Sequence, residues 1–162
     1  METPGDEPAI SEVHKQAFGG EAEALLIDRL RESGDLSVSK LVDTGEGKII
    51  AHAGFSPVKI GEDSDVHALA PIAVLPEWQR QGIGTRLIRA ALVGLERQSV
   101  DRVFVFGESA YFERFGFSPD LAAPYQSVDN EANLLALDLS SGTDIKSSGS
   151  LTFSPAFTEL PN

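Results

Sequence analysis

Residues 74–86 read Val74-Leu75-Pro76-Glu77-Trp78-Gln79-Arg80-Gln81-Gly82-Ile83-Gly84-Thr85-Arg86. This stretch combines the end of an apolar strand, a loop with two glycines and the start of a helix. Glycine has no β-carbon, so several backbone N–H groups of such a loop can converge on a ligand. The helix N-terminus adds a partial positive charge. Segment 74–86 is therefore a candidate site for a phosphate or pyrophosphate, with Arg80 and Arg86 as candidate side-chain contacts.

The glycine pattern excludes two familiar phosphate sites. A Walker loop continues with lysine and then serine or threonine after its last glycine, whereas Gly84 is followed by Thr85 and Arg86. A dinucleotide-binding fingerprint needs a third glycine where Leu87 stands. Two glycines at a helix start also occur simply because the chain turns there, so the loop alone leaves its ligand open.

Helices and strands are predicted on both sides of the loop from hydrophobic periodicity and from glycine and proline positions. Asp6 is expected to cap the first helix, and Pro71 is expected to break the third strand. In chain order the expected elements are a helix over Glu7–Phe18, a helix near Glu21–Arg31, strands over Val38–Asp43, Lys48–Ile60 and Val66–Leu75, a helix over Gly84–Arg97, a strand over Val103–Phe106, a short helix over Ser109–Phe115 and a strand over Leu134–Leu139.

This order of elements predicts a mixed α/β (α+β) domain built on a single sheet with helices on both faces. Residues 1–140 form the expected domain. The remaining residues, 141–162, begin as a Ser/Gly-rich connection and become apolar again at Leu151–Phe157. We expect this last segment to dock back on the same domain.

Composition excludes several classes of site. The chain contains no cysteine, which rules out disulfides, a thiolate nucleophile and cysteine-based metal centres. The three histidines, His14, His52 and His67, form none of the short motifs typical of zinc sites, so no metal site is expected. No stretch approaches the roughly 18 apolar residues of a membrane span, and the acidic N-terminus is unlike a signal peptide. A cytoplasmic protein that does not bind membranes is expected.

The chain is strongly acidic, with 25 acidic and 13 basic residues and a net charge of −12. Such a surface repels nucleic acids. It would attract cationic substrates such as amines, although solubility or adaptation to salt explains the same charge.

Two ordered motifs resemble the GNAT superfamily of N-acetyltransferases, in particular its YhbS-like branch. Gln79-Arg80-Gln81-Gly82-Ile83-Gly84 matches the acetyl-CoA loop of that family, and it follows the similar strand Ile72-Ala73-Val74-Leu75-Pro76. Downstream, Tyr111-Phe112-Glu113-Arg114-Phe115-Gly116-Phe117 resembles the family's aromatic helix and turn. The resemblance covers roughly residues 4–140, and it implies a mostly antiparallel sheet whose central strands splay apart.

The resemblance also implies acetyl-CoA as co-substrate and assigns positions that bind it. Amides of the loop would hold the pyrophosphate, and the splayed strand would hold the pantetheine arm. The implied CoA-binding positions are Ile72, Ala73, Val74, Gln79, Arg80, Gln81, Gly82, Ile83, Gly84, Thr85, Arg86 and Phe112. The implied reaction is direct acetyl transfer to an amine, with an oxyanion stabilised by a backbone N–H near Val74.

The catalytic acid departs from the family pattern. Many members carry a tyrosine that protonates the leaving thiolate, and the matching position here is Phe112. Tyr111, one residue earlier, is a candidate replacement, and water or a substrate group is the alternative. Tyr111 is equally typical of a core aromatic. Loss of general acid catalysis costs about 10²–10⁴-fold in rate, so its absence need not abolish turnover.

The general base and the acceptor are less constrained. His67 is the candidate base, with Glu62 and Glu108 as alternatives, whereas His52 is more typical of a satisfied core or surface histidine. The acceptor is expected to be a small-molecule amine or a protein amino group. Loops 17–26 and 122–130 are expected to line its pocket, and their acidic residues suit a cationic amine.

Two alternatives to this interpretation and one expectation about assembly remain. A non-catalytic CoA-binding regulatory module is the alternative to an enzyme, and Phe112 is its best argument. A binding domain for another nucleotide is disfavoured by the missing lysine and third glycine. The family usually opens with a strand, whereas this chain begins Met1-Glu2-Thr3-Pro4. The open neighbouring edge would then suit pairing in a homodimer.

Overall fold

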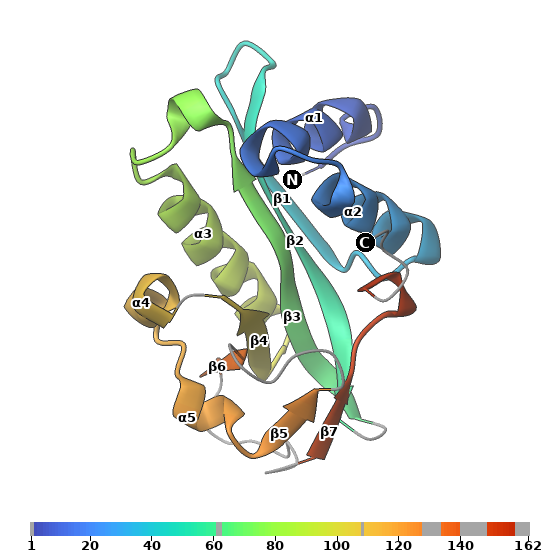
Figure 1. Ribbon diagram of the computed structural model, residues 1–162, viewed down its shortest axis with the longest axis vertical. Helices are drawn as coiled ribbons and strands as arrows, with labels where there is room; N and C mark the ends of the chain where they lie inside the picture. Colours follow the sequence, from blue (N-terminus) through green and yellow to red (C-terminus); the bar gives the residue numbers. More distant parts are fainter. Residues whose placement is uncertain (1, 61–62, 108, 128–133, 140–148, 158–162) are drawn as a thin grey trace. The chain divides into compact units, whose positions relative to one another are not determined.

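A computed structural model of the protein describes residues 2–60, 63–107, 109–127, 134–139 and 149–157 (Figure 1). The chain divides into two compact units. The first comprises Met1–Ser56, Ala70–Ala91 and Ser154–Asn162, and the second comprises Pro57–Leu69 and Leu92–Phe153. Long strands and one long helix contribute residues to both units.

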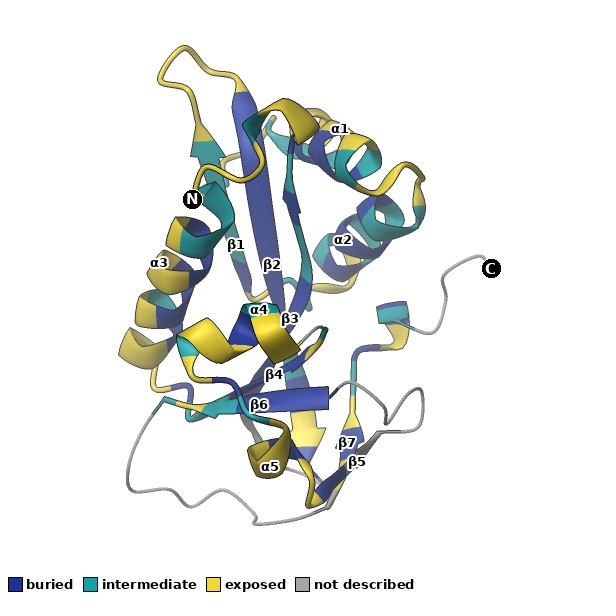
Figure 2. Cartoon of the chain, turned by 60° about the vertical axis from the view of Figure 1, so that its left-hand side comes forward, coloured by how far each residue is buried: buried dark blue, intermediate teal, exposed yellow. Residues whose placement is uncertain are grey.

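The first unit contains α1 (Glu7–Phe18), α2 (Ala22–Ser33), β1 (Val38–Asp43) and η1 (Pro76–Trp78). It also holds the first part of β2 (Ile49–Ile60), the last part of β3 (Asp63–Val74), the start of α3 (Ile83–Arg97) and η3 (Pro155–Phe157). Helices α1 and α2 lie on one side of these strands and α3 on the other (Figure 1). This explains why β2 is buried at every position from Ile49 to Ser56, as Figure 2 shows in dark blue.

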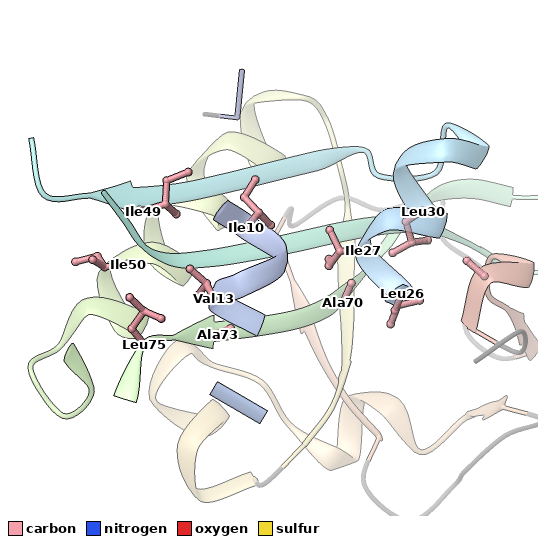
Figure 3. Packing of buried hydrophobic residues seen from close by; sticks show 11 residues of the cluster. Ile10, Val13, Leu26, Ile27, Leu30, Ile49, Ile50, Ala70, Ala73 and Leu75 are labelled. Atoms are coloured by element: carbon pink, nitrogen blue, oxygen red, sulfur yellow. The ribbon is translucent and has the colours of Figure 1, made fainter. Parts of the chain in front are cut away.

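The core of the first unit forms where α1 and α2 pack on the strands (Figure 3). Trp78 and Ile83, at the two ends of the glycine loop, pack against this core. Phe157, which the sequence predicts to dock back, does so too. The buried members are Ile10, Val13, Leu26, Ile27, Leu30, Ile49, Ile50, Ala70, Ala73, Leu75 and Ala156. In α2, Leu26 is buried and Leu25 is only half-buried.

The second unit is built on β4 (Arg102–Phe106), which pairs in parallel with β3 and antiparallel with β6 (Leu134–Asp138). A parallel pair of β5 (Tyr125–Ser127) and β7 (Gly149–Thr152) joins the end of β2, where Lys59 faces Thr152. Three short helices complete this unit: α4 (Ser109–Phe112), η2 (Glu113–Phe115) and α5 (Pro119–Ala122).

The strands are hydrogen-bonded in the order β5-β7-β2-β3-β4-β6, and β1 pairs with β2. This mixed, open, seven-stranded sheet confirms the predicted fold class. The division into residues 1–140 and 141–162 stays a prediction. Segment 140–148 lies outside the described residues.

Two local predictions are wrong. Strand β3 runs unbroken through Pro71, because its parallel ladder with β4 ends at Ala68 and the missing proline N–H removes none of those bonds. Asp6 stands at the N-cap of α1 without a side-chain cap bond to the helix. Its carboxylate instead accepts hydrogen bonds from the backbone N–H and hydroxyl of Thr3, at 2.8 and 2.9 Å, and these bonds lower the pKa of Asp6.

Candidate functional site

The glycine loop has an ordered backbone of unusual conformation. After η1, the Gln79 side chain donates to the Val74 carbonyl at 2.9 Å and ties the loop to the end of β3. Arg80 then takes φ 64° and Gly82 φ 80°, both in the left-handed region. A non-glycine residue in that region costs about 1–3 kcal/mol and persists only where its surroundings impose it. Alternating left-handed residues turn successive N–H groups toward a common concavity that suits an anion.

The amides of the loop and of the first turn of α3 are available to a ligand. Within the described part of the chain, the N–H groups of residues 80–85 make no turn or cap bond, and the first such bond is the one from Arg86 N–H to the Gly82 carbonyl, at 3.1 Å. The side chains of residues 79–81 are exposed, and Figure 2 shows exposed residues along the outer side of α3. A row of unpaired donors at a helix N-terminus fits a diphosphate.

The same segment is positively charged within an acidic protein. Residues 78–95 contain three arginines, Arg80, Arg86 and Arg89, and no acidic residue, whereas the whole chain carries −12. All three arginines are exposed, and neither Arg80 nor Arg86 forms an ion pair in the described residues. Glu77, the acidic residue nearest to Arg80 in sequence, has its carboxylate 3.7 Å from the Lys48 Nζ. Both arginines are therefore free to contact an anionic group.

Strand β3 leads into the loop, and its ladder with β4 ends before the strand does. The described ladder to β4 contains three pairs, Val66 to Ala68 against Arg102 to Phe104. Strand β3 nevertheless continues to Val74 and β4 to Phe106. Polar backbone groups at the end of β3 are thus left outside that ladder. Of the predicted contacts there, Ala73 is buried, and Ile72 and Val74 are half-buried.

The structure gathers the predicted pyrophosphate and pantetheine positions, 72–74 and 79–86, in the first unit. His67, Tyr111 and Phe112 lie in the second. His67 is 9% exposed, on β3. Glu62 and Glu108, as well as residues 128–130 of the expected acceptor loop, lie outside the described residues.

Tyr111 and Phe112 belong to an aromatic cluster completed by Phe115 and Phe117. The Tyr111 ring is half-buried, and the Arg114 guanidinium lies 4.5 Å from its centroid. Phe112 is buried, and a β-carbon built on Gly107 would stand only 2.4 Å from its ring. This role of Gly107 was not predicted, since a lone glycine after a strand gives no signal of what packs on it.

The described residues contain no group of three or more side chains suited to hold a metal ion, and none of their helices is long and apolar enough to cross a bilayer. His52, expected to be a satisfied core or surface histidine, is completely buried. Its hydrogen bond to His14 was not predicted, because 38 residues separate the two.

Comparison with known proteins assigns the family. Residues 8–117 match the acetyltransferase (GNAT) family. The chain is 36% identical over 124 residues to the uncharacterized N-acetyltransferase YhbS of Escherichia coli K12, covering 76% of this chain and 73% of that protein. It is 37% identical over 118 residues to the uncharacterized N-acetyltransferase YjhQ of the same strain, covering 70% of this chain and 65% of that protein.

Solved structures agree. The crystal structure of Escherichia coli YhbS in complex with CoA superposes with a TM-score of 0.89 at 28% identity, covering 99% of this chain and 91% of that one. The crystal structure of a GNAT acetyltransferase from Brucella melitensis in complex with acetyl-CoA superposes with a TM-score of 0.81 at 30% identity, covering 96% of this chain and 94% of that one. With the family match spanning residues 8–117, the chain belongs to the GNAT family of N-acetyltransferases.

Proposed function

We propose that the protein moves the acetyl group of acetyl-CoA directly to a primary amine while both substrates are bound. The observation that carries this proposal is the row of amides at residues 80–85 without a turn or cap bond, which follows a strand end outside the ladder to β4 and lies beside Arg80 and Arg86. The complexes of two relatives with CoA and acetyl-CoA support the choice of ligand.

In the proposed complex the amides of residues 81–85 hold the pyrophosphate, with Arg80 and Arg86 neutralising its charge. Polar backbone groups of Ile72 to Val74 bind the pantetheine arm. Phe112 also contacts CoA in this proposed complex.

The proposed reaction needs no covalent enzyme intermediate. The neutral amine attacks the thioester carbonyl carbon and forms the C–N bond, and the oxyanion is stabilised by a backbone N–H near Val74. The C–S bond then breaks and CoA leaves as a thiolate. Tyr111 gives that thiolate a proton, and His67 takes the proton that the amine nitrogen loses.

The acceptor is proposed to be cationic. Glu21, just before α2, and Glu23, in the first turn of α2, are described residues of the expected acceptor segment 17–26 and carry the charge that would attract an ammonium group. Candidates are polyamines, amino acids, aminoglycosides and peptide N-termini.

Thiol release tests the function. Because the chain has no cysteine, every thiol detected in the assay comes from CoA. Acetyl-CoA is incubated with a panel of the amines named above, and free thiol is titrated. We expect release that depends on both protein and amine. If calorimetry shows that CoA binds but no amine causes thiol release, the alternative, a regulatory CoA-binding module, is favoured. The observation that supports this alternative is Phe112 in place of a tyrosine. Absence of CoA binding would overturn both.

The open edge of β1 supports a second, smaller proposal, a homodimer. Beyond β2, its described backbone partner is Glu2, whose N–H donates to the Ser39 carbonyl at 3.3 Å. Light scattering across a concentration series tests this, and a monomer mass throughout would exclude it.

A further inference from the structure

A continuous chain of hydrogen bonds runs through the interior of the first unit. The His14 Nε2 lies 2.9 Å from the His52 Nδ1, and the His52 Nε2 lies 2.7 Å from the Ser39 hydroxyl. That hydroxyl donates to the Glu2 carboxylate, which also accepts from the Arg31 Nε at 2.8 Å. The chain therefore links the N-terminal segment, α1, β1, β2 and α2. We call His14, His52, Ser39 and Glu2 the imidazole chain.

The direction of every bond in the imidazole chain is fixed from its Glu2 end. Glu2, paired with Arg31, accepts hydrogen bonds, so the single Ser39 hydroxyl proton points at it. Ser39 must then accept from His52, which places the His52 proton on Nε2 and leaves Nδ1 as an acceptor. His14 must in turn donate from Nε2. Both imidazoles are thus neutral and carry their proton on Nε2, and the His14 Nδ1 is left buried without a partner in the described residues.

An additional proton has no favourable position in this arrangement. On the His52 Nδ1 it would face the His14 Nε2–H, and the hydrogen bond between the rings would be lost. On the His14 Nδ1 it would create a buried charge without an acceptor. Both side chains are 0% exposed, so water does not reach either ring.

The charges around the rings also oppose protonation. The positive charge of Arg31, on α2, disfavours a proton on either ring. The two carboxylates that contact Arg31 are already engaged, Glu2 by Arg31 and Ser39, and Asp28 by Arg31 at 2.8 Å. Burial, with Arg31, lowers the pKa of His14 to about 4. Burial, with His14 and Arg31, lowers the pKa of His52 to about 3.

We propose that the imidazole chain is an acid-operated latch, which holds α1 and the N-terminal segment against β1 and β2 while both rings are neutral and releases them when a ring gains a proton. A histidine freed by opening regains a pKa near 6.5, so below about this pH the open form binds more protons than the closed form. The latch is therefore fully closed above about pH 6.5, and its stability is lost as the pH falls from there toward 4. This inference is independent of the proposed acetyl transfer.

Hydrogen exchange on the full chain tests the latch. Protection factors, corrected for the pH dependence of intrinsic exchange, are compared at pH 7 and pH 5 for amides of α1 and, as an internal reference, of β4 and β6. We expect the opening constant of α1 to rise at least about tenfold at pH 5, with a much smaller change in the reference strands. Equal protection of α1 at both pH values, or an equal loss in all three elements, overturns the latch.

Two variants separate the histidines. In His14→Gln the amide still donates to the His52 Nδ1 and does not titrate, so the pH response of α1 should shrink about tenfold. His67→Gln removes the third histidine, in the second unit, and should leave the response at its wild-type size. A full wild-type response in His14→Gln contradicts the proposal. If His14→Gln does not fold, side-chain ¹⁵N NMR of the wild type decides: we expect both rings neutral and protonated on Nε2 at pH 6, and two ordinary imidazolium signals would overturn the proposal.

Discussion

Phe112 and Tyr111 are neighbours with different surroundings. Phe112 is buried over Gly107, with its ring edge-on to Tyr111 at 5.0 Å between centroids. Tyr111 is half-buried and carries Arg114 over its face. A phenol at position 111 is thus better exposed to a ligand than one at position 112 would be, which supports Tyr111 as the proposed acid.

Tyr111→Phe should lower kcat at least tenfold and leave CoA affinity almost unchanged, because only the proton donor is removed. Rates come from thiol release and affinity from calorimetry. Tyr125→Phe removes the only other phenol of the chain, which accepts from Arg102, and should leave kcat unchanged. An unchanged kcat in Tyr111→Phe removes this residue from the mechanism.

Gly107→Ala should destabilise the protein by about 1–3 kcal/mol, because the new methyl group meets the buried Phe112 ring at 2.4 Å. Urea unfolding measures the loss. Gly20→Ala is the matched control: nothing lies within 4 Å of its added carbon, and the change should cost little. Equal midpoints for the two variants would show that the Phe112 ring moves aside freely.

The junction between β3 and α3 is the element that prepares the proposed anion site. Its two ends are fixed by Trp78 and Ile83 in the core, and its middle is forced into the left-handed region at Arg80 and Gly82. Fixed ends and a constrained middle hold the amides in place before a ligand arrives. Preorganisation of this kind reduces the entropy lost on binding.

Gly82→Ala should weaken CoA binding about tenfold or more, because a β-carbon disfavours φ 80° and the amides of the loop lose their arrangement. Gly34→Ala places the same strain at φ 82°, at the end of α2. Both variants should lose about 1 kcal/mol of stability, and only Gly82→Ala should lose CoA affinity. Similar calorimetric constants for the two variants would mean that the loop conformation does not serve binding.

The charge of the whole chain is a property that no single element carries. At −12 it destabilises the folded state through self-repulsion, while residues 78–95 remain locally positive. An anionic substrate is therefore repelled by most of the surface and attracted to one segment. Salt screens both effects, and the repulsion acts over the longer range.

Raising NaCl from about 10 mM to 0.3 M at pH 7 should raise the unfolding temperature by about 2–4 °C, the equivalent of roughly 1 kcal/mol for a chain of this size. Calorimetry measures the shift. At pH 4.5, near the isoelectric point, net repulsion vanishes and the same salt should have little effect. An equal gain at both pH values would point to a salting-out effect instead of screened repulsion.

Local signals predicted much of this molecule. Helix α1 ends where Gly19 adopts φ 73°, and α2 ends at Gly34, as glycine after an amphipathic segment indicates. The strand–loop–helix order around Gly82 was also readable, because each of its preferences acts between residues close in sequence. The short elements α5 and β5 were missed, since four or three residues carry too little periodicity to be read.

Other features depend on partners that folding brings from far along the chain. Pro71 is accepted within β3 because the ladder to β4 has ended three residues earlier. His14 becomes a hydrogen-bond donor only because β2 places His52 opposite it, and burial then lowers the pKa of both rings. Periodicity and backbone preference are short-range and can be read from neighbours in sequence. Burial, strand pairing and desolvation depend on residues that are distant in sequence, so they are determined only by the folded arrangement of the chain.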